Sequence, residues 1–140
     1  MRKNILSILS LTATLLSLAV SSCLSNQSPD SAHNSGNSLD WAGVYTGTIP
    51  AASSPGIEVQ IRLNPDLTYE LRYEYLDRQN PIFNWAGSFR WDTAGSIITL
   101  DVKDLPPYYK VGENTLIQLD RNKNVITGSL ADNYILKKRI

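Results

Sequence analysis

The chain has 140 residues, of which 42% are hydrophobic, and it carries 13 Lys and Arg against 13 Asp and Glu. This length predicts one folded domain, and the balanced charge argues against a nucleic-acid-binding protein, because such a protein presents an excess of Lys and Arg to the phosphates. With a single cysteine, the chain cannot form an internal disulfide bond.

The first 22 residues have the composition of a secretory signal peptide. Arg2 and Lys3 make the start positive, and the stretch from Ile5 to Val20 is apolar and rich in Leu, Ala and Ser. A positive start, an apolar segment and small residues at its end are the three parts of such a signal. The apolar stretch is shorter than the roughly 20 residues that a membrane-spanning helix needs. We therefore expect residues 1–22 to be removed, which leaves 118 residues with a net charge of −2.

The signal ends at the only cysteine, Cys23. The residues Val20-Ser21-Ser22-Cys23 resemble a lipobox, the site at which bacterial lipoproteins receive a diacylglyceryl thioether before cleavage. The alternative is a free cysteine after an ordinary cleavage site, where the thiol would have no disulfide partner within the chain. We predict lipid attachment at Cys23, which anchors the protein to a membrane. The residue after the cysteine is Leu24, whereas an Asp at this position usually signals retention and prevents onward export in Gram-negative envelopes. The sequence therefore resembles that of lipoproteins exported to the outer membrane, and we expect the protein to face the periplasm.

The residues after the cysteine are polar. Between Ser25 and Ser38 the sequence consists mostly of Ser, Asn, Asp, Gly and Pro. Because this composition offers nothing to bury, we expect residues 23–38 to be a flexible tether and the folded domain to occupy residues 39–140. His33, the only histidine, lies in this tether and is interpreted as incidental rather than as a metal ligand.

From Leu39 onward, apolar and polar side chains alternate over several short stretches. Successive side chains on a β-strand point to opposite faces, so each stretch predicts a strand with one buried and one wet face. The clearest alternation predicts strands at Ile57–Leu63, Tyr69–Tyr75, Trp85–Trp91 and Ile98–Val102. Further short strands are expected at Trp41–Thr48, Tyr108–Val111, Thr115–Leu119, Val125–Leu130 and Tyr134–Lys137.

Turn-forming residues separate these stretches at 64–66, 77–81, 93–95 and 120–124. Close spacing and one-sided hydrophobicity predict an all-β fold, a small antiparallel meander closed into a barrel or folded into a sandwich. Six aromatic residues share the inward-facing parity: Tyr69, Tyr73, Tyr75, Trp85, Phe89 and Trp91. We favour a core role for them, because a domain of this size must bury most of its large side chains. The alternative is that they line a ligand cavity.

Taken together, the segments resemble the N-terminal domain of NlpE-type lipoproteins, a family known for copper resistance or homeostasis. The residues that carry the resemblance are Trp41–Pro50, Pro55–Ile57, Leu67–Leu71, Gly87–Trp91, Leu116–Asp120 and Tyr134–Lys137. The resemblance implies a lipocalin-like β-barrel, attachment to the outer membrane and a role in sensing envelope or surface stress.

The sequence departs from this family in one loop. Members typically carry Cys-x-x-Cys between the first and second strands, whereas this chain has Ala51 and Ser54 at those two positions. Soft thiolates select Cu(I), and neither Ala nor a protonated Ser hydroxyl can replace them. We therefore predict that copper binding and thiol exchange are absent from this loop, and no metal or other cofactor is expected.

Candidate catalytic residues have simpler interpretations. Ser53 and Ser54 could act as a nucleophile only with a base, and the folded part contains no histidine to serve as one. We therefore interpret them as part of a Pro/Gly turn between two strands. Glu70 and Glu74 lie on a predicted polar face. Asp101 and Asp104 lack the other oxygen ligands of a calcium loop. We predict that the protein is not an enzyme. The basic run at residues 137–139 reads as a solvated strand end, with contact to anionic lipid as the alternative.

Two functions from different classes remain open. The first is an interaction or stress-sensing module that binds another envelope protein, for which Leu105-Pro106-Pro107-Tyr108-Tyr109 is the candidate apolar patch. The same segment can instead be a rigid crossing loop packed on the barrel. The second function is a carrier of a small apolar ligand, which requires a cavity of roughly 300–1,000 Å³. We expect a monomer that contacts the membrane through its lipid.

Overall fold

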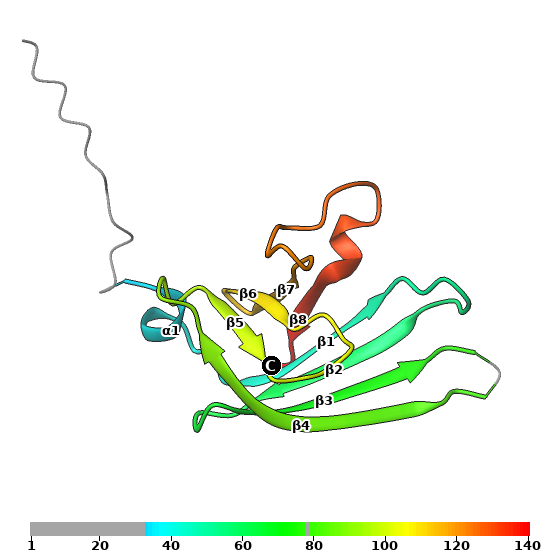
Figure 1. The fold of residues 1–140 in the computed structure, drawn as a ribbon, viewed down its shortest axis with the longest axis horizontal. Coiled ribbons are helices and arrows are strands. Elements are labelled where there is room, and N and C mark those ends of the chain that lie inside the picture. Colours follow the sequence, from blue (N-terminus) through cyan, green and yellow to red (C-terminus); the bar gives the residue numbers. More distant parts are fainter. Residues whose placement is uncertain (1–32, 78) are drawn as a thin grey trace, which may run out of the picture.

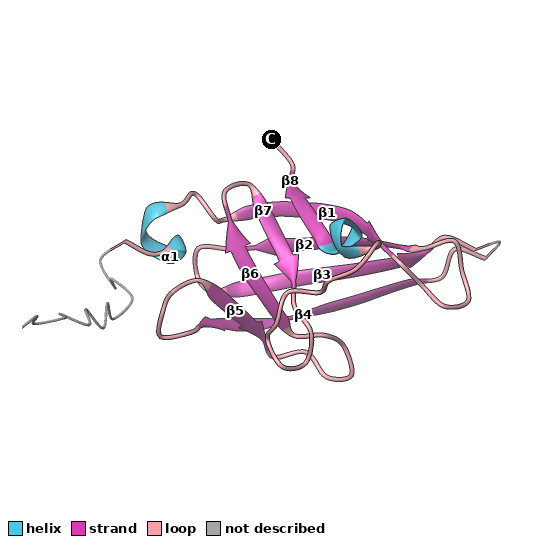
Figure 2. Cartoon of the chain, turned by 90° about the horizontal axis from the view of Figure 1, so that it is seen from above, coloured by secondary structure: helices cyan, strands magenta, loops and turns pink. Residues whose placement is uncertain are grey.

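The computed structural model describes residues 33–77 and 79–140, which form an eight-stranded antiparallel barrel (Figures 1 and 2). The predicted signal peptide and Cys23 lie outside the described residues. The strands follow one another around the barrel in chain order: β1 Gly43–Ile49, β2 Ile57–Leu63, β3 Thr68–Tyr75, β4 Ile82–Trp91, β5 Ile97–Leu100, β6 Tyr108–Gly112, β7 Thr115–Gln118 and β8 Ile135–Lys138. A short helix, α1 (Ser35–Ser38), precedes them, and a 3-10 helix, η1 (Ala131–Tyr134), precedes β8. The predicted all-β barrel is confirmed.

The period of two seen in the sequence places the core inside the barrel. In β2, Ile57 and Ile61 are buried, whereas Glu58 and Arg62 are exposed. Each apolar side chain removed from water contributes roughly 1.5–3 kcal/mol to stability. The side chains buried almost completely are Tyr45, Val59, Ile61, Leu63, Tyr69, Leu71, Ile98, Leu100, Tyr109, Leu116, Leu119 and Leu136.

The strands differ in the extent of their pairing, and this gives the barrel two unlike ends. β1 to β4 pair with one another over seven residues at each junction. In contrast, β4 and β5 pair only from Phe89 to Trp91, and β1 and β8 pair only at Tyr45 and Thr46. Strands β1–β4 therefore extend as a curved sheet beyond the part that β5–β8 complete (Figure 1). We call the completed part the closed end and the part with the β1–β2 and β3–β4 turns the open end.

The strand predicted at Val125–Leu130 is wrong. This segment makes one isolated bridge, between Val125 and Leu119, and otherwise forms an exposed loop. The side chains of Val125 and Leu130 are 51% and 53% exposed. Gly128 has a φ of +109°, which interrupts an extended conformation. The apolar residues of this segment therefore do not belong to a strand, and β8 begins only at Ile135.

Residues 35–38, which the sequence predicts to be part of the tether, form helix α1 and make hydrogen bonds to the barrel. Ser35 donates a hydrogen bond from Oγ to the Val111 carbonyl at 2.9 Å. Backbone N–H of Gly36 donates to the Gly95 carbonyl at 3.1 Å, and Trp41 Nε1 donates to the Gly36 carbonyl at 3.0 Å. Polar groups of this short segment are thus satisfied by the barrel itself, which orders α1 against the closed end.

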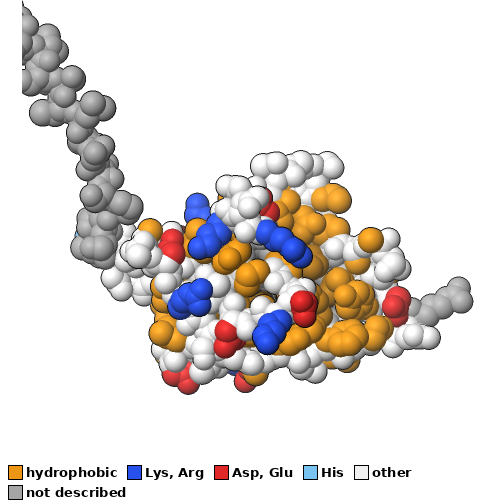
Figure 3. Space-filling view, in the orientation of Figure 1, with side chains coloured by type: hydrophobic (Ala, Val, Ile, Leu, Met, Phe, Trp, Pro, Cys, Tyr) orange, Lys and Arg blue, Asp and Glu red, His pale blue; other side chains and the backbone are white. Residues whose placement is uncertain are grey.

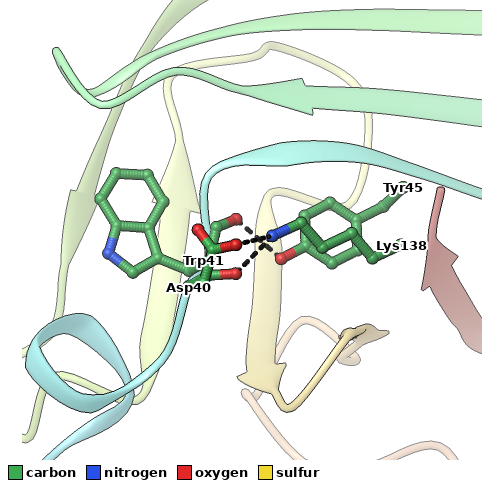
Figure 4. A network of polar contacts seen from close by, with 4 residues as sticks. All are labelled: Asp40, Trp41, Tyr45 and Lys138. Atoms are coloured by element: carbon green, nitrogen blue, oxygen red, sulfur yellow. Dashed lines mark hydrogen bonds and ion pairs between the residues drawn. The ribbon is translucent and has the colours of Figure 1, made fainter. Parts of the chain in front are cut away.

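Lys138 closes the barrel between its first and last strands (Figure 4). Its Nζ donates to the Asp40 carbonyl at 2.5 Å and forms an ion pair with Asp40 Oδ2 at 3.0 Å. Beside it, Tyr45 Oη donates to the Trp41 carbonyl at 2.7 Å. The Lys138 side chain is only 10% exposed, so the interpretation of the basic run as a solvated strand end is wrong for this residue. Gly43, at φ +147°, leaves the space that the Lys138 side chain occupies.

Candidate interaction surface at the open end of the barrel

Four aromatic side chains line the inner face of the open end. Register pairs Tyr73 with Phe83 and Leu71 with Trp85, so these residues of β3 and β4 face the same side of the sheet. Trp85 lies edge-on to Tyr73, with ring centroids 5.5 Å apart, and stacks with Phe83 at 6.1 Å. Phe83 also meets Tyr75 edge-on at 5.9 Å. These distances suit favourable aromatic pairs, and we call Tyr73, Tyr75, Phe83 and Trp85 the open-end cluster.

Exposure rises along this cluster toward the β3–β4 turn. Tyr73 is 3% exposed, whereas Phe83 is 48% exposed, and its neighbour on the outer face, Ile82, is 49% exposed. On the side of the molecule seen in Figure 1, Figure 3 shows that hydrophobic atoms gather on the part farther from α1. Phe83 and Ile82 thus leave two large apolar side chains half-exposed on opposite faces of one strand end, an exposure more typical of a binding surface than of a folding core.

The open-end cluster lies far from the place where the described chain begins. Figures 1 and 2 both show α1 at one end of the molecule and the β3–β4 turn at the other. The β1–β2 turn, residues 50–56, lies at the same end, because Leu76 N–H donates to the Gly56 carbonyl at 2.9 Å. The open-end cluster therefore lies at the end of the described chain opposite α1.

Three buried side-chain oxygen atoms lie within or next to the open-end cluster. Tyr73 Oη, Tyr109 Oη and Gln118 Oε1 are buried and have no hydrogen-bond partner among the described residues. Tyr109 and Gln118 are cross-strand neighbours, and the Tyr109 and Tyr73 hydroxyls are close enough to influence each other electrostatically. Burial raises the pKa of Tyr109 well above its ordinary value, and the nearby Tyr73 adds to this rise. Both hydroxyls therefore stay protonated and remain potential hydrogen-bond donors.

The inward-facing aromatic residues divide between core and surface. Tyr69, Tyr73 and Phe89 are buried, which confirms their predicted core role. Tyr75, Trp85 and Trp91 are only half-buried and pack against that core. The sequence parity identified which face they share, but not how far the rest of the barrel covers each of them.

The loop that differs from the family pattern has a structural role. Ala51 packs against the core, and Ser54 Oγ donates to the Gly56 carbonyl at 2.9 Å. Ser54 thus stabilises the turn that leads into β2. Within the described part of the chain, no group of three or more His, Cys, Asp or Glu side chains is placed to hold a metal ion.

Acidic residues singled out in the sequence have local partners. Glu70 lies 3.5 Å from Arg62, and Glu74 lies 2.6 Å from Arg72 on the outer face. Asp101 Oδ2 accepts a hydrogen bond from the Ser88 backbone N–H at 3.1 Å, where β5 ends beside β4. Burial, followed by the hydrogen bond and charge of Asp101, raises the pKa of Tyr69 to about 12. These contacts support strands and turns rather than a reaction centre.

The proposed apolar patch at residues 105–109 does not form an exposed surface. Tyr109 is completely buried, and Tyr108 is half-buried with Lys123 Nζ lying 4.9 Å from its ring centroid. The alternative interpretation, a crossing segment packed on the barrel, is therefore the correct one.

No helix in the described part of the chain is long and apolar enough to cross a membrane.

Comparison with known proteins identifies similar sequences and structures. A family model, the NlpE N-terminal domain, matches residues 45–129. The chain is 30% identical over 94 residues to lipoprotein NlpE of Escherichia coli K12, an alignment that covers 66% of this chain but only 39% of that protein. The chain thus spans well under half the length of this curated relative.

Two solved structures are also similar. A putative lipoprotein from Shewanella oneidensis shares 48% sequence identity with a TM-score of 0.71, over 76% of this chain and 95% of that one. The structure of the Cpx pathway activator NlpE from E. coli shares 29% identity with a TM-score of 0.53, over 62% of this chain and 46% of that one.

Proposed function

Because this chain belongs to the NlpE family, we propose that it is a lipoprotein of the bacterial cell envelope that works as a non-catalytic interaction or stress-sensing module. It is anchored through a lipid on Cys23, in the outer membrane and facing the periplasm. The observation that carries this proposal is the half-exposed open-end cluster at the end of the molecule opposite α1. A protein held by its N-terminal segment would present this cluster away from its anchor.

The chemistry of the open-end cluster suits protein recognition. Aromatic side chains that become buried at interfaces often contribute more than about 2 kcal/mol to binding, because they are large and lose few rotamers. Phe83 and Ile82 are half-exposed, and Trp85 supports Phe83 by stacking. The relative from E. coli is described as a Cpx pathway activator, and a signalling role of that kind requires a surface that another envelope protein can bind.

Lipid attachment is tested by replacing its acceptor. Full-length wild type and Cys23→Ser are expressed in a Gram-negative host that is fed radioactive palmitate, and the membranes are separated on a density gradient. We expect the label and outer-membrane association in the wild type, with loss of the label in Cys23→Ser. Absence of label from a wild-type chain found free in the periplasm would reject the anchor.

Partner binding is tested by affinity capture from solubilised envelopes with three forms of the full chain. Phe83→Ser changes the open-end cluster, and Arg90→Ser changes an exposed residue of the same strand at the closed end. The expected result is a protein retained by the wild type and Arg90→Ser and reduced at least tenfold with Phe83→Ser. Equal retention by a folded Phe83→Ser would reject this surface.

A second candidate function is a carrier of a small ligand. The observation that favours it is the set of buried oxygens of Tyr73, Tyr109 and Gln118 next to the open-end cluster, of which only the two tyrosine hydroxyls lie within reach of each other. A neutral ligand that both accepts and donates hydrogen bonds would satisfy them, while its apolar part contacts Phe83 and Trp85. Native mass spectrometry of the periplasmic protein distinguishes the two functions: a bound organic mass that is lost in Tyr73→Phe/Tyr109→Phe supports a carrier, and a ligand-free mass argues against it.

A further inference from the structure

Strand β4 has a free edge at the open end. β5 pairs only with Phe89–Trp91, and Asp101 then occupies the next position by hydrogen bonding to the backbone of Ser88. The preceding residues of β4, 82–87, pair with β3 on one side. On the other side, no described residue of the chain forms a strand against them.

The direction of the backbone groups along this edge follows from the antiparallel pattern. Phe89 N–H donates to the Leu67 carbonyl, so the odd-numbered residues of β4 bond to β3. Residues that alternate with them direct N–H and C=O to the opposite side. Ile82, Asn84 and Ala86 therefore present their backbone donors and acceptors at the free edge, and all three are exposed. Unpaired groups in a row are a template for another strand.

From this edge we propose that the protein forms a symmetric dimer through antiparallel pairing of β4 with β4 of a second copy. The free groups lie at residues 82, 84 and 86, so their midpoint is Asn84, and a two-fold axis there satisfies all of them. Asn84 faces Asn84 of the second copy, and Ile82 faces Ala86 of the second copy on both sides of the axis. Every free N–H and C=O then gains a partner.

The side chains around the edge favour a second copy as the occupant. On the inner face, this register brings Phe83 beside Trp85 of the second copy, which extends the stacking already present within each chain. On the outer face, the exposed Ile82 meets the small Ala86. Arg72, the charged neighbour of Asn84 on β3, is neutralised by Glu74 at 2.6 Å and does not repel its symmetry mate.

The molecule also has room for the incoming strand at the end of this edge. A hollow of about 360 Å³ lies between Trp85 and Ala86 of β4 and the Asp101–Asp104 segment. In the dimer, this hollow receives the start of β4 from the second copy. The inner faces of both sheets lie on the same side, so the two open-end clusters form one continuous surface. The proposal departs from the expected monomer and does not depend on the proposed function.

Disulfide trapping tests the register in the full chain. In the dimer, residues 84 of the two copies form a hydrogen-bonded pair with Cα atoms about 5.5 Å apart, within the range of a disulfide. Residues 86 of the two copies are offset by four positions, roughly 13 Å. Membranes with Asn84→Cys or Ala86→Cys are treated with the oxidant diamide. We expect at least a tenfold higher yield of disulfide dimer from Asn84→Cys than from the equally exposed Ala86→Cys, and cross-linking between co-expressed Ile82→Cys and Ala86→Cys chains.

Light scattering of the purified full chain in detergent provides an independent readout of the dimer. Wild type is expected to have the mass of two chains, and Asn84→Pro the mass of one, because proline removes an N–H that points out of the barrel and bonds to nothing within it. An unchanged circular dichroism spectrum would show that the variant is folded. A wild-type chain that is monomeric at 100 µM, or equal trapping of Asn84→Cys and Ala86→Cys, would overturn the proposal.

Discussion

Each end of the barrel carries an aromatic cluster, but of the two only the open-end cluster contains an exposed aromatic side chain. At the closed end, Trp41 meets Phe89 and Trp91 edge-on, with ring centroids 5.7 and 5.6 Å apart. Helix α1 lies beside this cluster, because the Gly36 carbonyl accepts the Trp41 Nε1 hydrogen bond and a Cβ at Gly36 would meet the Trp91 ring. At the open end, Phe83 remains 48% exposed beside Trp85.

This difference separates stability from binding along a single strand. Phe83 and Phe89 lie on the same face of β4, six residues apart, and have the same side chain. Phe89 is 4% exposed and belongs to the continuous core, whereas Phe83 lies beyond the last residues that β5 covers. We infer that the closed end holds the fold together and that the open end is available for contacts with other molecules.

The largest expected effect comes from truncating these two phenylalanines. Phe89→Ala removes a buried ring and leaves a cavity, so we expect a loss of about 3–5 kcal/mol in the free energy of unfolding. Phe83→Ala removes a ring that is already half in water, and its loss should stay below about 1.5 kcal/mol. Urea unfolding of both variants measures the difference. Similar losses would show that the open end belongs to the folding core.

Alkaline pH should destabilise the protein through its buried tyrosines. Burial, followed by the charge of Asp40, raises the pKa of Tyr45 to about 12, and Tyr69 has a similarly raised pKa. The folded state therefore holds these protons more tightly than the unfolded state, whose tyrosine pKa is 10.0. Stability is fully present below pH 10 and falls between pH 10 and 12, by at most about 1.4 kcal/mol per pH unit for each group. Unfolding curves of wild type and Tyr69→Phe check this, and the fall should be smaller in the variant.

A smaller effect is expected at the contact that closes the barrel. Lys138→Met removes a hydrogen bond from a nearly buried ammonium group and should cost about 1–2 kcal/mol. Asp40→Asn keeps the backbone carbonyl that Lys138 binds and changes a side chain that is 93% exposed, so its cost should be under about 1 kcal/mol. Thermal unfolding of the pair tests this order. A greater loss from Asp40→Asn would mean that the ion pair, rather than the carbonyl contact, closes the barrel.

The smallest change in stability is expected from restoring the family motif in the β1–β2 turn. Ala51→Cys/Ser54→Cys should change the free energy of unfolding by less than about 1 kcal/mol, because only the local hydrogen bonds of Ser54 Oγ with the Gly56 carbonyl and N–H are lost. The two thiolates should bind one equivalent of Cu(I), whereas the wild-type turn should bind none. Competition with a colorimetric Cu(I) chelator measures the difference, and Cu(I) uptake by the wild-type turn would contradict our interpretation of Ala51 and Ser54.

Much of the fold could be predicted from the sequence because alternation is local. The alternation of apolar and polar residues over Ile57–Leu63 predicts both the strand and the face of it that is buried. A strand is also expected at Val125–Leu130, yet this segment forms a loop, since a local sequence pattern does not reveal whether a partner strand is available. The ordering of α1 and the burial of Lys138 depend on partners 76 and 98 residues away, which no local pattern indicates.

The candidate site was harder to predict than the fold. Parity grouped Tyr73, Tyr75 and Trp85 with the buried Phe89, because all four share one face of the sheet. Tyr75 and Trp85 are more exposed than Phe89, which lies where β4 pairs with β5. The length of the β4–β5 pairing is set by the whole barrel and cannot be read from one strand. Phe83 was not singled out, although its place two residues before Trp85 put it on the same face.

Photo-cross-linking in living cells tests the division between the two ends most directly. A photoreactive phenylalanine analogue is introduced into the full chain at Phe83, at the open end, or at Arg90, an exposed position of β4 at the closed end. Our account predicts a discrete cross-linked product from position 83 and at least tenfold less from position 90. Equal yields from both positions, or a product from position 90 alone, would contradict the conclusion that the open end is the binding surface.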